Sequence, residues 1–96
     1  MRPSEVFEQN RDFVREAVTR YPMRNPRIFG SVLHGTDTEG SDIDILVDAP
    51  VGTTLLHLIG LEQELQSKLG VRVQVLTPED LHRFFRDKVL AEARPI

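Results

Sequence analysis

Apolar residues recur along this chain with two different periods, and each change of period marks a new element. In residues 4–20 the spacing is close to the helical repeat of 3.6 residues. The apolar positions there are Val6, Phe13, Val14, Ala17 and Val18. We expect Ser4 to cap this helix, because its hydroxyl can accept a hydrogen bond from the first turn. Pro22 and Pro26 end it, since proline cannot continue a helix.

Two later segments alternate with period two, which is typical of half-buried strands. Residues 42–47 alternate acidic and apolar side chains, starting at the Asp-Ile-Asp-Ile run. Residues 71–76 place valines on one face and Arg72 and Gln74 on the other. A third, shorter strand is expected at residues 27–29.

Two further helices are expected in the second half of the chain. The first covers residues 53–69, with Glu62 as the one polar interruption of its apolar line, and Gly70 is a natural end for it. The second is expected to begin with Thr77 as its cap and Pro78 at its first position. Its apolar stripe consists of Leu81, Phe84, Phe85 and Val89. We expect Phe84 and Phe85 to be core and partner contacts rather than a platform for base stacking.

The order of elements predicts the fold class. Helix, strand, turn, strand, helix, strand and helix indicate an α/β domain with one small mixed β-sheet flanked by helices. Residues 1–96 leave no room for a second domain. A hydrophobic fraction of 40% supports only a modest core, so self-association or a partner protein would add stability.

Composition narrows the function classes. The net charge of −3 argues against general nucleic-acid binding, which favours a basic surface. The absence of cysteine excludes disulfides and thiolate metal sites. No apolar run approaches the roughly 18 residues of a membrane span, and no signal-peptide pattern opens the chain. We therefore expect a cytoplasmic protein that binds neither membrane nor nucleic acid.

The candidate chemistry lies between residues 30 and 44. Asp42 and Asp44 are two positions apart on a predicted strand, so both carboxylates leave the same face. They repel each other unless a cation lies between them, and Mg²⁺ prefers oxygen ligands of this kind. Alone, the pair is equally compatible with a solvated strand face. Gly30-Ser31 favours the metal, because glycine lets the backbone approach a phosphate and the serine hydroxyl can donate to its oxygens.

Together these residues resemble the nucleotidyltransferase superfamily that includes DNA polymerase β. Its pattern of Gly-Ser, a spacer and Asp-h-Asp-h (h, apolar) is matched here by Gly30-Ser31, ten residues and Asp42-Ile43-Asp44-Ile45. The segments GSVLHGTDTEGSDIDILVD and VQVLTPEDLHRFFRDKVLAEA resemble minimal nucleotidyltransferases (MNT proteins), often encoded beside a HEPN toxin. The resemblance implies the polymerase β-like fold. It also implies that Gly30 and Ser31 hold ATP, and that Asp42 and Asp44 bind nucleotide and Mg²⁺ and serve as the catalytic residues.

One position departs from that family's pattern. A third acid on a later strand completes the family's site, and the matching position here is Gln74. An amide oxygen can coordinate a cation, but it carries no charge and cannot act as a base. We therefore expect the metal that activates the nucleophile to bind more weakly here than in a site with three acids.

Other polar residues are weaker candidates. Asp48 has the same parity as Asp42 and Asp44 but is expected to be a solvated acid, and Asp37 and Glu39 are expected to be flexible surface charges. His34 follows Ser31 and is a lesser candidate for a phosphate contact. Arg72 could meet a phosphate or pair with a nearby acid.

The resemblance implies an MNT-type antitoxin that binds Mg-ATP and neutralises a HEPN toxin by transferring AMP to a toxin tyrosine. Gln74 raises a second hypothesis, a binding module that has lost catalysis and neutralises its partner by contact. A third is a solitary enzyme that modifies a small molecule such as an aminoglycoside, although such enzymes usually carry an additional helical domain.

Overall fold

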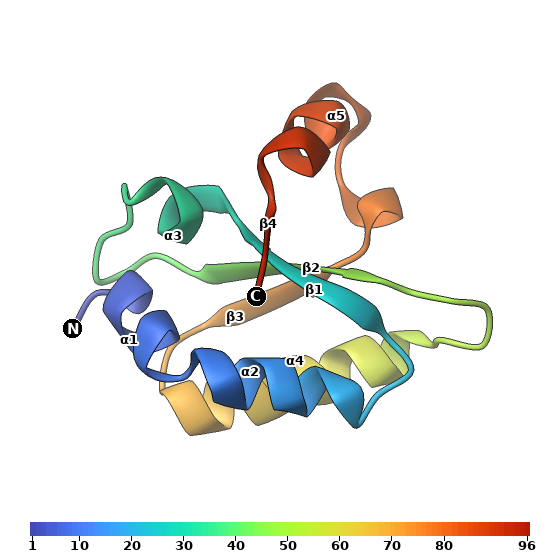
Figure 1. Cartoon of the computed structure of the whole chain (residues 1–96), viewed down its shortest axis with the longest axis horizontal. Helices are drawn as coiled ribbons and strands as arrows, with labels where there is room; N and C mark the ends of the chain where they lie inside the picture. The colour runs from blue at the N-terminus through green and yellow to red at the C-terminus, as the bar shows by residue number, and fades with distance from the viewer.

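One mixed sheet of four strands organises the chain (Figure 1). In a computed structural model that describes all 96 residues, its strands are β1 (Arg24–Phe29), β2 (Ile43–Asp48), β3 (Val73–Leu76) and β4 (Arg94–Pro95). Their order across the sheet is β3-β2-β1-β4. β1 runs antiparallel to both β2 and β4, while β2 and β3 are parallel. The mixed α/β architecture expected from the sequence is confirmed.

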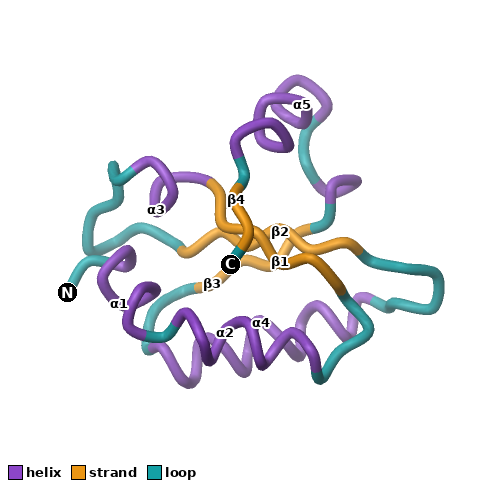
Figure 2. The backbone as a smooth tube through the Cα atoms, in the orientation of Figure 1, coloured by secondary structure: helices purple, strands orange, loops and turns teal.

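The helices lie on both sides of this sheet (Figures 1 and 2). They are α1 (Pro3–Gln9), α2 (Arg11–Thr19), α3 (Gly30–His34), α4 (Leu55–Leu69), the 3₁₀ turn η1 (Pro78–Asp80) and α5 (Arg83–Glu92). α4 connects β2 to β3, because two parallel strands need a crossover of this kind. No helix combines the length and the apolar character needed to cross a membrane.

The main core fills the space between the sheet and helices α1, α2 and α4. On β2 it takes Ile43, Ile45 and Val47, all with 0% exposed surface, as the alternating pattern predicts. The facing helices contribute large apolar side chains, among them Phe7, Val14, Val18, Leu61, Leu65 and Leu69. The acidic residues of β2 therefore point to the opposite face of the sheet.

That opposite face is only partly covered. A small apolar cluster of Phe29, Leu46 and Leu81 lies there, with Val89 and Ala93 of the α5 region packed against it. α5 itself buries no residue, and Phe84 and Phe85 are 74% and 62% exposed. The expectation that these two rings are core residues is wrong, because the helix packs against the cluster through Val89. Their role as partner contacts stays a prediction.

The first helix of the sequence is two helices rather than one. Asn10 separates α1 from α2: its φ of −120° is not helical, and its side-chain amide donates to the Val6 carbonyl at 2.8 Å. Asparagine favours such breaks because its side chain competes for backbone hydrogen bonds. The cap of α1 is Arg2 and not Ser4, with Pro3 at the first helical position.

The starts of β1 and of the last helix also differ from the sequence prediction. β1 begins at Arg24 rather than at residue 27, because a register irregularity between Arg24 and Arg27 accommodates Pro26 within the strand. The helix expected to start after Thr77 is only the 3₁₀ turn η1, and α5 starts anew with His82 as its cap. Buried Leu81 lies between them in an extended conformation.

β3 is an edge strand whose free backbone groups are bonded to α4. The Val75 N–H donates to Glu62 Oε2 at 2.8 Å, and the Val73 N–H donates to Gln66 Oε1 at 3.1 Å. An unpaired edge invites pairing with another chain, and these side chains cover it. Glu62 interrupts the apolar line of α4 because its carboxylate binds the backbone of the edge strand.

Candidate active site

The site begins at the turn that connects β1 to α3. Phe29 is extended, and Gly30 then takes a positive φ of +76°, which glycine adopts without strain. A Cβ atom at position 30 would come within 2.3 Å of Asp44 Oδ2. Only glycine lets the backbone of this turn lie directly against that carboxylate. Ser31 follows in the first turn of α3, where free N–H groups and its hydroxyl could donate to phosphate oxygens.

Asp42 and Asp44 lie where the loop after α3 enters β2. Asp42 precedes the strand by one residue and Asp44 is its second residue. Asp44 is paired in register with Phe29 on one side and with Gln74 on the other. Neighbouring strands are about 4.8 Å apart, so Gln74 is beside Asp44, as the sequence predicts. The alternation of β2 sends both acids to the face away from the main core.

A matching family explains this combination of residues. A sequence model of the nucleotidyltransferase domain matches residues 10–96, which include the Gly30 turn, both acids and Gln74. The chain belongs to the nucleotidyltransferase domain family.

Relatives of this nucleotidyltransferase carry more specific names. Protein adenylyltransferase MntA of Thermococcus cleftensis is 37% identical over 78 residues, covering 81% of this chain and 79% of the relative. Two Methanocaldococcus jannaschii proteins, each named "putative protein adenylyltransferase", are 40% identical over 74 residues and 36% identical over 89 residues. The first match covers 77% of this chain and 80% of the relative, and the second covers 93% and 91%.

Solved structures agree with the fold. One described as "putative minimal nucleotidyltransferase" is 36% identical, with a TM-score of 0.85, and the match covers 97% of this chain and 95% of that one. A toxin–antitoxin structure with AMP-PNP matches at a TM-score of 0.76 and 23% identity, covering 90% of this chain and 71% of the other. At that identity the second likeness shows the fold alone.

The charge of Asp42 acts on Asp44 in this nucleotidyltransferase domain. Burial, and after it the charge of Asp42, raises the pKa of Asp44 to about 6. Asp42 in turn lies 3.5 Å from the Arg72 guanidinium, measured from Oδ1 to Nε. A carboxylate held close to a second one, with its pKa raised in this way, is stabilised by any cation that binds between them.

The donor set fits a hard cation such as Mg²⁺. Asp42 and Asp44 offer carboxylate oxygens, and Gly30 places no side chain against Asp44. No third acid, histidine or cysteine joins them to form a larger metal-binding group. Gln74 adds an uncharged amide on the same face, so the site has one ligand charge fewer than a three-acid site.

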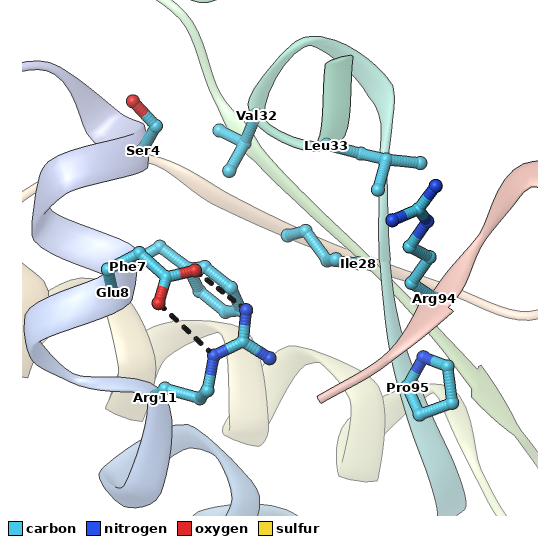
Figure 3. A pocket seen from close by; sticks show the side chains of 9 residues that line it. All are labelled: Ser4, Phe7, Glu8, Arg11, Ile28, Val32, Leu33, Arg94 and Pro95. Atoms are coloured by element: carbon cyan, nitrogen blue, oxygen red, sulfur yellow. Dashed lines mark hydrogen bonds and ion pairs between the residues drawn. The ribbon is translucent and has the colours of Figure 1, made fainter. Parts of the chain in front are cut away.

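Neither acid lines any of the three pockets of the molecule. A pocket of about 280 Å³ lies instead between α1, β1, α3 and β4 (Figure 3). Phe7, Ile28 and Val32 line it, and the Arg11 guanidinium beside it is bonded to Glu8 at 2.7 Å. Neither Asp42 nor Asp44 lines this pocket.

The prediction that Asp37 is a flexible surface charge is wrong. Asp37 is only 4% exposed. Its carboxylate pairs with Arg2 at 2.7 Å and accepts the Ser4 N–H at 2.8 Å. Burial alone would raise the pKa of Asp37, but the hydrogen bonds from Ser4 and Arg2 outweigh it and lower the pKa. Arg2 also donates to the Gly35 carbonyl at 3.0 Å, so the loop between Ser31 and Asp42 is tied to α1.

Three of the remaining candidates pair with groups other than Asp42 and Asp44. Asp48, at the far end of β2, is bonded to Arg27 at 2.5 Å, and Glu39 lies 3.6 Å from the amino terminus of the chain. His34 pairs with Glu92 at 2.9 Å, which links the end of α3 to the end of α5. Arg72 is the one secondary candidate that the structure brings to the site.

Proposed function

We propose that residues 1–96 form one nucleotidyltransferase domain that binds ATP with Mg²⁺ and transfers AMP to a hydroxyl of a partner protein. The observation that carries this proposal is the contact of the Gly30 turn with Asp44. It brings a phosphate-binding backbone and a pair of cation-binding carboxylates to one place. In this role Gly30 and Ser31 bind the triphosphate, and Asp42 and Asp44 bind the metal and the nucleotide.

The reaction would be a single displacement at the α-phosphorus. The acceptor hydroxyl oxygen forms a bond to that phosphorus, and the bond to the bridging oxygen of the β-phosphate breaks. Pyrophosphate leaves with the electron pair, and the hydroxyl proton passes to water, because the amide of Gln74 cannot accept it. Mg²⁺, when bound, supplies charge neutralisation of the triphosphate. The domain's own residues fix the phosphates in line with the acceptor.

The acceptor we propose is a tyrosine of a HEPN toxin, which this protein would neutralise as an antitoxin in the cytoplasm. Support comes from the relatives named protein adenylyltransferase, MntA among them. Further support comes from the fold shared with the MntA–HepT toxin–antitoxin structure, with a TM-score of 0.68.

A second function is favoured by a specific observation. Gln74 occupies the place beside Asp44 where a third acid is expected, and an amide cannot serve as a base. On this hypothesis the domain is a catalytically degenerate binding module that neutralises its toxin by contact. Both hypotheses predict a complex with the toxin, but only the first predicts a modified toxin.

The test uses ATP labelled at the α-phosphate, Mg²⁺ and the partner protein. The wild-type domain should label the partner, and the Asp42→Asn, Asp44→Asn double variant should not. Asp48→Asn is a matched control, because it removes an acid from the same strand but one that is bonded to Arg27. Neutralisation by the double variant without labelling would favour the binding module. Equal Mg-ATP binding by wild type and double variant, measured by calorimetry, would overturn the proposed site.

A further inference from the structure

Each acid of the site has a residue of β3, or the residue just before that strand, directly beside it. The register pairs Asp44 with Gln74 and Ile43 with Val73, so the position beside Asp42 is Arg72. A backbone hydrogen bond of 2.9 Å from the Ile43 N–H to the Arg72 carbonyl continues the pairing to that point. The Arg72 guanidinium lies 3.5 Å from Asp42. The acid pair therefore has a cation of its own.

The contact between Arg72 and Asp42 is easily exchanged for another. The Arg72 side chain is 80% exposed, and the Nε–Oδ1 distance of 3.5 Å is long for a hydrogen bond. Exposed ion pairs of this kind add little to stability. A guanidinium binds phosphate with paired, parallel hydrogen bonds, so a triphosphate beside Asp42 is a better partner for Arg72 than a single carboxylate.

The charges around the site fit one divalent ion better than two. No third acid, histidine or cysteine joins Asp42 and Asp44, since no group of three such side chains forms. Asp48 lies farther along β2 and is held by Arg27 at 2.5 Å. Two metal ions about 3.5–4 Å apart repel each other strongly and need more anionic ligands than this pair. A guanidinium already present adds to that repulsion.

We propose that Arg72 is the second cation of this site: one divalent ion binds to Asp42 and Asp44, and the Arg72 guanidinium moves from Asp42 to the triphosphate. This inference rests on the proposed function, because it assigns Arg72 a role toward the same nucleotide. Arg72 is then a nucleotide-binding residue. With Gln74 in place of an acid the site has one negative charge fewer, and the Arg72 guanidinium takes the place of one metal ion.

The experiment measures metal and nucleotide binding separately. Mn²⁺ replaces Mg²⁺, bound Mn²⁺ is counted by electron paramagnetic resonance, and the affinity for ATP is measured with a fluorescent ATP analogue. The wild-type protein should bind one Mn²⁺ per nucleotide. Arg72→Met should weaken nucleotide binding by about tenfold or more, the usual effect of losing a charge-assisted hydrogen bond. Arg72→Lys should retain part of the affinity.

Binding of Mn²⁺ without nucleotide should not weaken in Arg72→Met. Arg72→Met removes a cation that competes for Asp42, so the variant should bind the bare ion as tightly as the wild type or more tightly. A loss of structure would weaken both kinds of binding and cannot produce this pair of results. Arg83→Met is the matched control, since it removes an exposed positive charge from α5, and it should change neither affinity.

The outcomes that overturn the inference differ from those that overturn the proposed function. Unchanged nucleotide affinity in Arg72→Met, or two Mn²⁺ ions per nucleotide in the wild type, would overturn the role of Arg72 alone. No nucleotide binding by the wild type, or full binding by the Asp42→Asn, Asp44→Asn double variant, would overturn the proposed site and this inference with it.

Discussion

Gly30 lies so close to Asp44 that a Cβ atom on residue 30 would be 2.3 Å from Asp44 Oδ2. The turn into α3 and the second acid of β2 are therefore in contact without any side chain between them. Gly30 also has a φ of +76°, which side chains rarely allow. Position 30 thus requires glycine for two reasons: the backbone has a positive φ, and the Asp44 carboxylate leaves no room for a side chain.

Gly30→Ala should separate these two reasons when it is compared with Gly70→Ala. Gly70 has nearly the same φ of +73°, but nothing lies within 4 Å of a Cβ atom there. Both variants should lose about 1–2 kcal/mol from the left-handed backbone. Gly30→Ala should lose more, because it also displaces Asp44, and it alone should lose Mg-ATP binding.

Chemical denaturation and calorimetry on the two variants would check this. Equal losses of stability together with intact Mg-ATP binding in Gly30→Ala would contradict the prediction. It would mean that Asp44 can move away from the turn without consequence for the site.

The raised pKa of Asp44 makes stability depend on pH in a defined direction. Burial and the neighbouring Asp42 raise the pKa from an ordinary 3.8 to about 6. A carboxyl with a higher pKa in the folded state stabilises the fold below the ordinary pKa, and this contribution is lost as pH rises through the folded value. Without metal at pH 7–8, Asp44→Asn should therefore raise the free energy of unfolding by about 1–2 kcal/mol after solvent screening. Its melting temperature should then lie several degrees above that of the wild type.

The difference in melting temperature should shrink toward pH 4, because Asp44 is protonated there and is then uncharged, like asparagine. Thermal melting of both proteins between pH 4 and pH 8 measures it. Asp42→Asn should also lower the pKa of Asp44 in a carbon NMR titration, because it removes the neighbouring charge. A melting difference that is the same at every pH would show that Asp44 is not the titrating group.

The two parallel strands that carry the site could be predicted from the sequence, because the alternation of apolar and polar residues is a local pattern. Alternation in residues 42–47 places Ile43 in the core and Asp44 on the other face, and the structure agrees at each position. The position of Gln74 follows from the same reasoning on a second strand. Periodicity determines which face a side chain takes, and the parallel pairing of β2 with β3 then brings Asp44 and Gln74 together.

Long-range contacts explain what the sequence could not predict. Asp37 looks like a loop acid among glycine, threonine and glutamate, and only its pairing with Arg2, 35 positions away, makes it a buried residue. Phe84 and Phe85 look like core residues, but α5 contacts the sheet through Val89. The sequence left open whether Arg72 meets a phosphate or a nearby acid, because its distance from Asp42 depends on strand register.

Glu62 offers a test of how the edge of the sheet is protected. Its carboxylate accepts the Val75 N–H at 2.8 Å, so Glu62→Ala leaves a part-buried donor unpaired. An unsatisfied donor costs about 1–3 kcal/mol, and the amide hydrogen of Val75 should also exchange faster. Gln63→Ala is the control, because Gln63 is exposed on the same helix. Denaturant unfolding that gives equal stabilities for the two variants would rule out this role for Glu62.

Gln74→Asp asks whether the missing acid limits catalysis. Gln74 lies in register with Asp44, so an aspartate there adds a third carboxylate to the face that carries the site. The variant should bind a second Mn²⁺ per nucleotide and transfer AMP to the partner faster, since general-base help is worth about 10²–10⁴-fold. Gln74→Asn is the matched control: it has the side-chain length of aspartate without the charge, and it should resemble the wild type.

Single-turnover transfer of labelled AMP measures the rate, and the count of bound Mn²⁺ separates a metal effect from a base effect. A faster rate with still one ion would assign the gain to proton removal, and a second ion with no gain in rate would show that Arg72 already supplies what that ion provides. Brisk transfer by the wild type, unchanged in Gln74→Asp, would contradict the prediction and show that the reaction proceeds without a third acid.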